Sequence, residues 1–376
     1  MKTSYAHNLG RSVTILAFLT TLSGARGDAQ QISTKSFDLE EGGTVRIVLS
    51  AGNIEITPWG RNTVKVDAVN DDDDLTVSKN GNTVLVRSWS DVDVQVSVPQ
   101  RINLDLQCGS GDIQIDGSMN GSLKARTSGG EIGIRDFNGG VSVSTGGGGV
   151  MCGNIDGKVF VESAGGDLQM GNIKGEVDLE TDGGDIEVKD VNKSITARTS
   201  GGSLLVGSVG GNVRLQTSGG DIEVGPVTGE STLESSGGNI IVHGGGGRID
   251  ASTSGGDLTL ERVAGSFSGQ TSAGNITASV IARGKRSDGK LSSGGGNILL
   301  EISPEASATI VATVHESGRW QDDEDESTIT SDFPAVTYRK DSGNGEITAT
   351  YRLNDGSGKI TLDASMGSIT IRKGAR

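Results

Sequence analysis

The chain has 376 residues, of which 61 are glycine and 5 are proline, with 33% hydrophobic and 3% aromatic content. This low aromatic content argues against an ordinary aromatic-rich globular core. A repetitive arrangement must therefore bury the apolar residues. The formal net charge of −15 argues against binding to nucleic acid or anionic lipid, because both carry the same sign. Cations and neutral glycans are easier partners.

The N-terminus has the features of a secretory signal peptide. Lys2 and Arg11 precede an apolar run, Val13–Leu22, which is followed by small residues. The run is too short to span a bilayer. We expect a signal peptide over residues 1–25, with cleavage after Ala29 satisfying the small-residue rule equally well, and we expect no transmembrane segment in the mature chain.

The next and longest part of the chain repeats a turn followed by a short alternating apolar stretch. One copy is Ser-Gly-Gly-Asp-Ile-Glu-Val at Ser218–Val224. We call the residue after the last turn glycine the anchor residue and each repeat a coil. Anchors recur every 18 residues, at Glu131, Gly149, Asp167, Asp185, Ser203, Asp221, Asn239, Asp257 and Asn275. A period held this long without slip predicts a repeat architecture.

Apolar residues occupy fixed offsets around each anchor. For Asp221 they are Val213, Leu215, Ile222, Val224 and Val227, with polar residues between them. Spacing by two predicts strands with one buried face. Four residues before each anchor lies an inward-phased hydroxyl column, at Thr127, Thr145, Ser163, Thr181, Thr199, Thr217, Ser235, Thr253 and Thr271. Glycines eight residues after most anchors predict a second set of tight corners.

A coil with so few inward side chains cannot bury them alone, so coils must stack at about 4.8 Å each. The predicted fold is all-β, a single-stranded parallel β-helix (solenoid) with 18-residue coils, right-handed by the usual hand of parallel crossovers. The same offsets around Asn53, Asp112 and Ser368 extend it toward both ends. We expect one solenoid domain in residues 30–376, irregular over 44–106, regular over 107–300 and irregular again over 301–372.

Carboxylates in the turns are candidates for calcium binding. A stacked edge formed by Asp167, Asp185, Asp221 and Asp257 resembles the glycine-aspartate repeats of calcium-binding β-rolls only in part, because here the aspartate directly follows Gly-Gly and alternates with Ser and Asn. The alternative is that these residues close the turn by bonding the backbone. The acidic runs Asp71–Asp74 and Asp322–Glu326 lack the glycine spacing of a calcium loop and are interpreted as solvated loops.

Catalytic residues are not evident. Glu162 and Glu180 share an outward offset on successive coils, about 5 Å apart, the separation that a retaining glycosidase requires. Their column continues through Arg198, Gln216 and Glu234, which is typical of a ladder of exposed ion pairs. The histidines, at His7, His243 and His315, form no zinc or triad pattern. We expect no enzyme and no cofactor.

The cysteines of this exported chain invite a disulfide, but their phases argue against one. Cys108 lies in the hydroxyl column and Cys152 at an inward apolar offset two coils away. The expected separation of about 10 Å exceeds the bridging limit. We expect two buried free thiols.

A signal peptide, a strand-rich start ending in Val98-Pro99 and reiterated T-S-G-G-D-I-x-V turns together resemble the bacterial putative-adhesin family of β-strand-repeat domains, a domain of unknown function. The chain is also similar to that family's head-domain relatives. The resemblance covers nearly all of the mature chain and implies a β-helix at the cell envelope. Because the shared motif consists of turn glycines and core positions, it implies no functional residue.

The leading hypothesis is an exported, non-catalytic adhesin or binding protein of the bacterial cell envelope that presents its repeat faces to an envelope or extracellular protein or to a glycan. It would act in the periplasm, at the cell surface or after secretion. The main alternative is a structural or assembly module of the envelope, and a polysaccharide-active enzyme is the third. Retention on envelope polysaccharide or host-cell extracts separates the first from the others.

Overall fold

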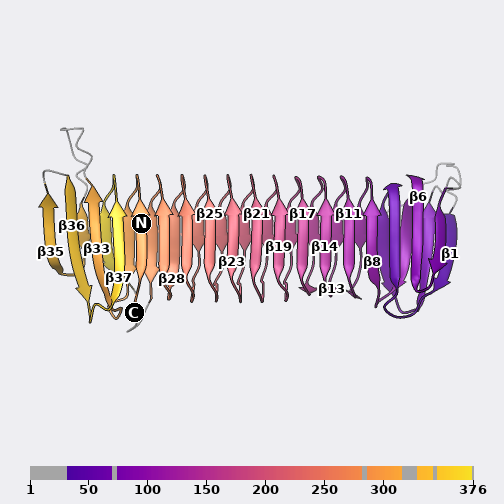
Figure 1. Ribbon diagram of the computed structural model, residues 1–376, viewed down its shortest axis with the longest axis horizontal. Helices are drawn as coiled ribbons and strands as arrows, with labels where there is room; N and C mark the ends of the chain where they lie inside the picture. Colours follow the sequence, from indigo (N-terminus) through magenta and orange to yellow (C-terminus); the bar gives the residue numbers. More distant parts are fainter. Residues whose placement is uncertain (1–31, 70–73, 282–285, 316–327, 342–344, 375–376) are drawn as a thin grey trace, which may run out of the picture.

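The computed structural model describes residues 32–69, 74–281, 286–315, 328–341 and 345–374. The predicted signal peptide, Asp71–Asp73 and the run Asp322–Glu326 lie outside these ranges. Within them the fold is all-β, and its strands stack side by side into a long rod with extended parallel sheets (Figure 1). This arrangement is consistent with a β-helix-like solenoid.

Two long sheets and one short sheet run along the rod. The first sheet contains, in spatial order, β35 (Ala335–Asp341), β36 (Glu346–Leu353), β33 (Ala308–His315), β37 (Gly358–Ala364), β31 (Gly289–Ser293), β29 (Phe267–Thr271), β27 (Ile249–Thr253), β25 (Ser231–Ser235), β23 (Val213–Thr217), β21 (Ile195–Thr199), β19 (Val177–Thr181), β17 (Val159–Ser163), β14 (Val141–Thr145), β11 (Leu123–Thr127), β8 (Asn103–Cys108), β2 (Thr44–Ala51), β6 (Thr83–Asp91) and β5 (Thr76–Asn80). The second contains β34 (Ile329–Ser331), β38 (Ile369–Lys373), β32 (Ile298–Ile302), β30 (Ile276–Val280), β28 (Leu258–Val263), β26 (Ile240–Val242), β24 (Ile222–Val224), β22 (Leu204–Val206), β20 (Ile186–Val188), β18 (Leu168–Met170), β15 (Val150–Cys152), β12 (Ile132–Ile134), β9 (Ile113–Ile115), β3 (Ile54–Trp59), β7 (Asp93–Pro99), β4 (Thr63–Val69) and β1 (Ile32–Asp38). The short sheet contains β10 (Met119–Asn120), β13 (Phe137–Asn138) and β16 (Ile155–Asp156).

Strands in the middle of the rod pair in parallel with the equivalent strand of the next coil. β11 pairs with β14 so that Leu123 faces Val141 and Thr127 faces Thr145. The same register recurs from β14 to β17 and from β17 to β19. Each residue therefore stacks on the residue in the same column of the neighbouring coil, and inward columns stay inward along the rod.

The stack departs from chain order at its N-terminal end. β2 pairs with β8 and β3 pairs with β9, so the coil of Asn53 lies directly on the coil of Asp112. The coil of β6 and β7 comes between them in sequence but lies on the outer side of β2 and β3. Antiparallel pairs finish this end, with β5 on β6, β4 on β7 and β1 on β4.

The C-terminal end uses the same device. β37 and β38 pair in parallel with β31 and β32, so the distant anchors Asn297 and Ser368 become neighbours. β33 and β34 come from the intervening segment and lie on the outer side, and β36 and β35 continue the first sheet in antiparallel pairs. Both long sheets thus end in strands that differ from the repeating coil, which is how repeat proteins terminate a stack.

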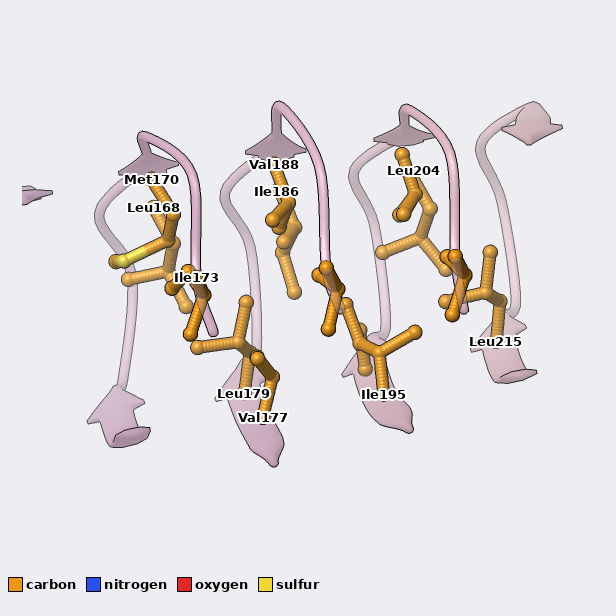
Figure 2. Close-up of a cluster of buried hydrophobic side chains, with 14 of the residues drawn as sticks. Leu168, Met170, Ile173, Val177, Leu179, Ile186, Val188, Ile195, Leu204 and Leu215 are labelled. Carbon is orange, nitrogen blue, oxygen red and sulfur yellow. The ribbon is translucent and has the colours of Figure 1, made fainter. Parts of the chain in front are cut away.

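The predicted core is confirmed. In the Asp221 coil, Val213, Leu215, Ile222, Val224 and Val227 are all at most 3% exposed. Figure 2 shows the equivalent side chains of neighbouring coils in the space that each coil encloses. The interior is a continuous column of Val, Ile and Leu, because each coil covers the apolar ends of the previous one.

The hydroxyl column is also inward, as predicted, and it joins successive turns. Thr199 Oγ1 donates to the carbonyl oxygen of Gly184, at 2.9 Å, and accepts from the backbone N–H of Gly202, at 3.2 Å. Ser235 makes the same pair of bonds with Gly220 and Gly238. Each hydroxyl satisfies one backbone group in its own turn and one in the neighbouring turn.

The last turn glycine is required by the close approach of coils. A Cβ added to Gly220 would lie 2.1 Å from the carbonyl oxygen of Gly202. The glycine column after the anchors behaves alike, since a Cβ on Gly157 would lie 2.0 Å from the oxygen of Gly139. Stacking distance, and not turn conformation alone, therefore explains these glycines.

One coil has a weaker core than its neighbours. Ser231 occupies the inner position that is Val213 in the previous coil and Ile249 in the next. Its side chain is 1% exposed and its Oγ has no hydrogen-bond partner among the described residues. Gly245, in the same coil, occupies the inner position of Val227. Both substitutions remove apolar contacts, and the first also buries an unsatisfied hydroxyl.

We predict that Ser231→Val raises the free energy of unfolding by about 1–2 kcal/mol, because it removes an unpaired buried hydroxyl and adds two methyl groups at a position where the neighbouring coils carry Val213 and Ile249. Ser235→Val, on the same strand, should lower the free energy by about 1–3 kcal/mol, because Gly220 and Gly238 would each lose a partner. Urea unfolding of both variants measures the difference. Equal effects of the same sign would contradict the assignment.

Candidate functional site

The predicted carboxylate pair lies together on the outer face of the first sheet. Glu162 on β17 is directly opposite Glu180 on β19, and both side chains are exposed. They border a hollow of about 130 Å³, which is lined by Ser144, Thr145, Glu162, Ser163, Ala164, Glu180 and Asp182. Retaining glycosidases place their acid and their nucleophile in different environments. These glutamates instead occupy equivalent positions of one column, in a hollow too small to enclose a sugar.

The anchor aspartates use their side chains to join coils. Asp167 Oδ1 accepts the backbone N–H of Asp185 at 2.9 Å, and Asp185 Oδ1 accepts that of Ser203 at 2.7 Å. Asp221 and Asp257 accept the N–H groups of the next anchors at 2.6 and 2.7 Å. The alternation of Asp, Asn and Ser follows, because each supplies a short oxygen acceptor at that distance.

The anchor arrangement leaves little for a cation. One oxygen of each candidate aspartate is occupied by an amide, whereas calcium takes six or more oxygen ligands. In the described ranges, no group of three or more His, Cys, Asp or Glu residues is placed to hold a metal ion. The geometry therefore supports the alternative given above, in which these side chains bond the backbone.

We predict that millimolar calcium or a chelator leaves the melting temperature of the mature chain unchanged. A ligand that binds only the folded state must raise the melting temperature. At a hundredfold excess over Kd it adds about 2.7 kcal/mol to the free energy of unfolding. Differential scanning calorimetry in calcium and in EDTA measures this, with magnesium as the control. A rise in melting temperature with calcium but not with magnesium would contradict this prediction and support a calcium site.

Both cysteines are buried free thiols. Cys108 Sγ donates weakly to the carbonyl oxygens of Gly52 and Ser110, at 3.0 and 2.9 Å, in the place of a hydroxyl of the inward column. Burial raises the pKa of the Cys108 thiol and raises that of Cys152 to about 12. Thiols held protonated in this way are poor nucleophiles.

His243 has partners on both neighbouring coils, which the sequence analysis missed. Its Nδ1 lies 2.9 Å from Glu261 Oε2, and its Nε2 lies 2.9 Å from Glu223 Oε1. The hydrogen bond to Glu261, followed by that to Glu223, raises the pKa of His243, and partial burial opposes this rise. The 18-residue spacing from His243 to Glu261 was a readable signal, because it places both in one column.

Exposed apolar side chains are scattered along the outer faces. Met151, Phe160 and Leu205 lie on three different strands and do not form one stripe. Trp89, on β6 near the N-terminal end of the rod, is the most exposed large apolar side chain of the described residues, at 67%. The guanidinium of Arg87 lies 5.8 Å from its ring centroid.

The surroundings of Trp89 are charged. Its backbone N–H donates to Asp74 Oδ2 at 3.2 Å, which places a carboxylate beside the strand. An exposed indole with a guanidinium over its ring and a carboxylate at its backbone combines an apolar surface with a donor and an acceptor. Sequence reasoning missed this arrangement because Trp89 lies outside the regular repeat, where no column predicts exposure.

A second hollow, of about 500 Å³, lies at a corner of the rod and is lined by Arg101, Asn120, Gly121 and Asn138. Asn138 Nδ2 donates to Asn120 Oδ1 at 2.9 Å, and Arg101 lies 3.5 Å from Glu41. Its polar side chains can exchange hydrogen bonds with a hydroxylated ligand, but nothing in it resembles the apolar lining of a small-molecule pocket.

No protein-family model matches the chain, and no curated protein sequence matches it significantly. Among solved structures it is similar to a putative adhesin from Bacteroides fragilis NCTC 9343, with 11% identity, a TM-score of 0.24 and coverage of 91% of this chain and 98% of that one. It is also similar to a putative cell adhesion protein from Clostridium sporogenes ATCC 15579, with 8% identity, a TM-score of 0.16 and coverage of 92% of this chain and 100% of that one. A third similar structure is a putative adhesin from Parabacteroides distasonis ATCC 8503, with 12% identity, a TM-score of 0.24 and coverage of 72% of this chain and 97% of that one.

These descriptions agree with the resemblance stated from the sequence. The fold rests on the strand pairing described above. No helix in the described ranges is long and apolar enough to cross a membrane.

Proposed function

We propose that the chain is an exported, non-catalytic adhesin or binding protein of the bacterial cell envelope. Its mature part, residues 30–376, is one domain, a right-handed parallel β-helix of 18-residue coils with irregular coils at both ends. It displays its outer faces to an extracellular or envelope partner in the periplasm, at the cell surface or after secretion. It needs no cofactor.

One observation carries this proposal: the repeated inward and turn residues are committed to stacking, so only the outer faces are free to vary. In the Asp221 coil, the inward valines, the hydroxyl of Thr217 and the turn glycines all contact neighbouring coils. The outward Arg214 and Glu223 are exposed, and their columns vary, with Thr196 and Thr232 beside Arg214 and with Leu205 and Ile241 beside Glu223. An extended surface of varied polar side chains suits recognition of an extended partner.

A glycan is the partner class that the exposed chemistry favours. Trp89 offers an indole face on which the C–H face of a pyranose can stack, while Arg87 and Asp74 can bond its hydroxyls. The excess of acidic residues disfavours anionic partners. A neutral saccharide satisfies both conditions.

We predict that the mature chain is retained on a neutral glycan array or on envelope polysaccharide, and that Trp89→Ala weakens binding at least about tenfold, or ~1.4 kcal/mol. Phe160→Ala, which removes an exposed ring from the middle of the rod, is the matched control and should leave the affinity unchanged. Surface plasmon resonance gives both Kd values. Equal losses in both variants would exclude Trp89 as the contact.

A structural or assembly role is favoured by the continuous hydrogen bonding along the rod. If the chain binds neither glycans nor envelope fractions, but its loss weakens the envelope, that second function replaces the first. Polysaccharide hydrolysis that is abolished by Glu162→Gln or Glu180→Gln would overturn both. Because a retaining glycosidase needs both carboxylates, either substitution alone should remove such activity.

A further inference from the structure

The coil from Ser231 to Gly247 has a weaker core than the coils on either side, and His243 lies in it. Its inner positions carry Ser231 and Gly245 where its neighbours carry Val or Ile. The space that a side chain at Gly245 would take is filled by Ile249, whose Cδ1 would lie 2.7 Å from an added Cβ. This coil therefore contributes less apolar contact to the core than those on either side.

The corner that follows His243 has an unusual backbone. Gly244 has a φ of 134°, and Arg262, in the next coil, has a φ of 48°, one of two positive values among described residues other than glycine. Arg262 Nη2 donates to the carbonyl oxygen of His243 at 2.6 Å. A strained non-glycine residue persists only where its surroundings hold it, and this contact is one such restraint.

The two carboxylates determine which form of His243 the site accepts. Each ring nitrogen lies 2.9 Å from a glutamate oxygen, Glu261 on one side and Glu223 on the other. Only the imidazolium carries N–H on both nitrogens. The neutral ring keeps one donor and directs a lone pair at the other carboxylate, so one of the contacts to neighbouring coils is lost.

We propose that protonated His243 fastens this weak coil to the coils on both sides, and that loss of the proton releases it, which makes the coil a pH-sensitive point of local opening. The charged groups that face the imidazole are Glu223 of β24 with Glu261 and Arg262 of β28. The nearby outward residues Ile241 of β26 and Thr259 of β28 do not titrate.

The direction of the pH dependence follows from the raised pKa of His243. The unfolded value is about 6.5, so the stabilisation is fully present below about pH 6.5. It is lost as the pH rises through the higher folded value. Each unit of pKa difference corresponds to about tenfold in the opening equilibrium. Protection of this coil should therefore fall from neutral to mildly alkaline pH, while other coils keep theirs.

Hydrogen exchange of the mature chain between pH 5.5 and 9, corrected for intrinsic rates, tests this proposal. We expect protection of amides 240–247 to fall about tenfold relative to amides 186–193, whose coil has no histidine. His243→Gln should be insensitive to pH, and Lys174→Gln, which breaks the 2.6 Å ion pair with Asp156 elsewhere, should keep the wild-type profile. Parallel profiles for both segments of the wild type would overturn the proposal.

An NMR titration of the imidazole in the unaltered chain keeps the proposal testable if His243→Gln does not fold. The expected result is a His243 pKa above the ordinary value, lowered by Glu261→Gln. Titration at the ordinary value would refute the fastening role. Ser231→Val, which restores apolar contact to the same coil, should raise the protection of amides 240–247 at every pH and leave both the pH-dependent loss and the titration unchanged, because the added contact does not depend on charge.

Discussion

Parallel, in-register hydrogen bonding between coils is the constraint on which the rest of the structure depends. Because Leu123 faces Val141, and the next strands repeat this register, each residue lies against its counterpart in the next coil. A backbone separation near 4.8 Å leaves no room for a side chain where turns meet, which is why Gly220 cannot carry a Cβ. The repeated sequence is thus a consequence of contact between like positions.

The same constraint moves function to the surface. Most inward positions are apolar, the hydroxyls bond two turns, and the Asp, Asn and Ser anchors supply a short acceptor to the next coil, as Asp185 does for Ser203. A carboxylate in the anchor column is therefore a structural acceptor first, however much its motif suggests a cation. The outward positions obey only a weak rule, that they tolerate their neighbours along a column.

Sequence reasoning succeeded where position in the repeat determines environment. The inward set around Asp221, the hydroxyl bonds of Thr199 and the adjacency of Glu162 and Glu180 all follow from offset arithmetic. The order in which the coils stack at the two ends does not follow from offset arithmetic. An offset assigns a residue to a column but not to a level of the stack, so nothing in it places the coil of β6 and β7 outside that of β2 and β3.

Side chains that reach between columns were also beyond offset arithmetic. The contact of His243 with Glu261 stays in one column, but that with Glu223 crosses from one column to another and depends on side-chain length. Trp89 lies in an irregular coil, where exposure depends on where the stack ends. Both belong to the part of the molecule that repetition does not determine.

Nearest-neighbour stacking also decides how such a rod can move. Each coil contacts only the coils on its two sides, so its stability is the sum of its own contacts and two interfaces. The coil of Ser231 has lost inner apolar contacts at both interfaces, while the antiparallel strands at the two ends protect the terminal coils. Local opening is therefore favoured inside the rod, where an imidazolium bridging two carboxylates compensates for missing methyl groups.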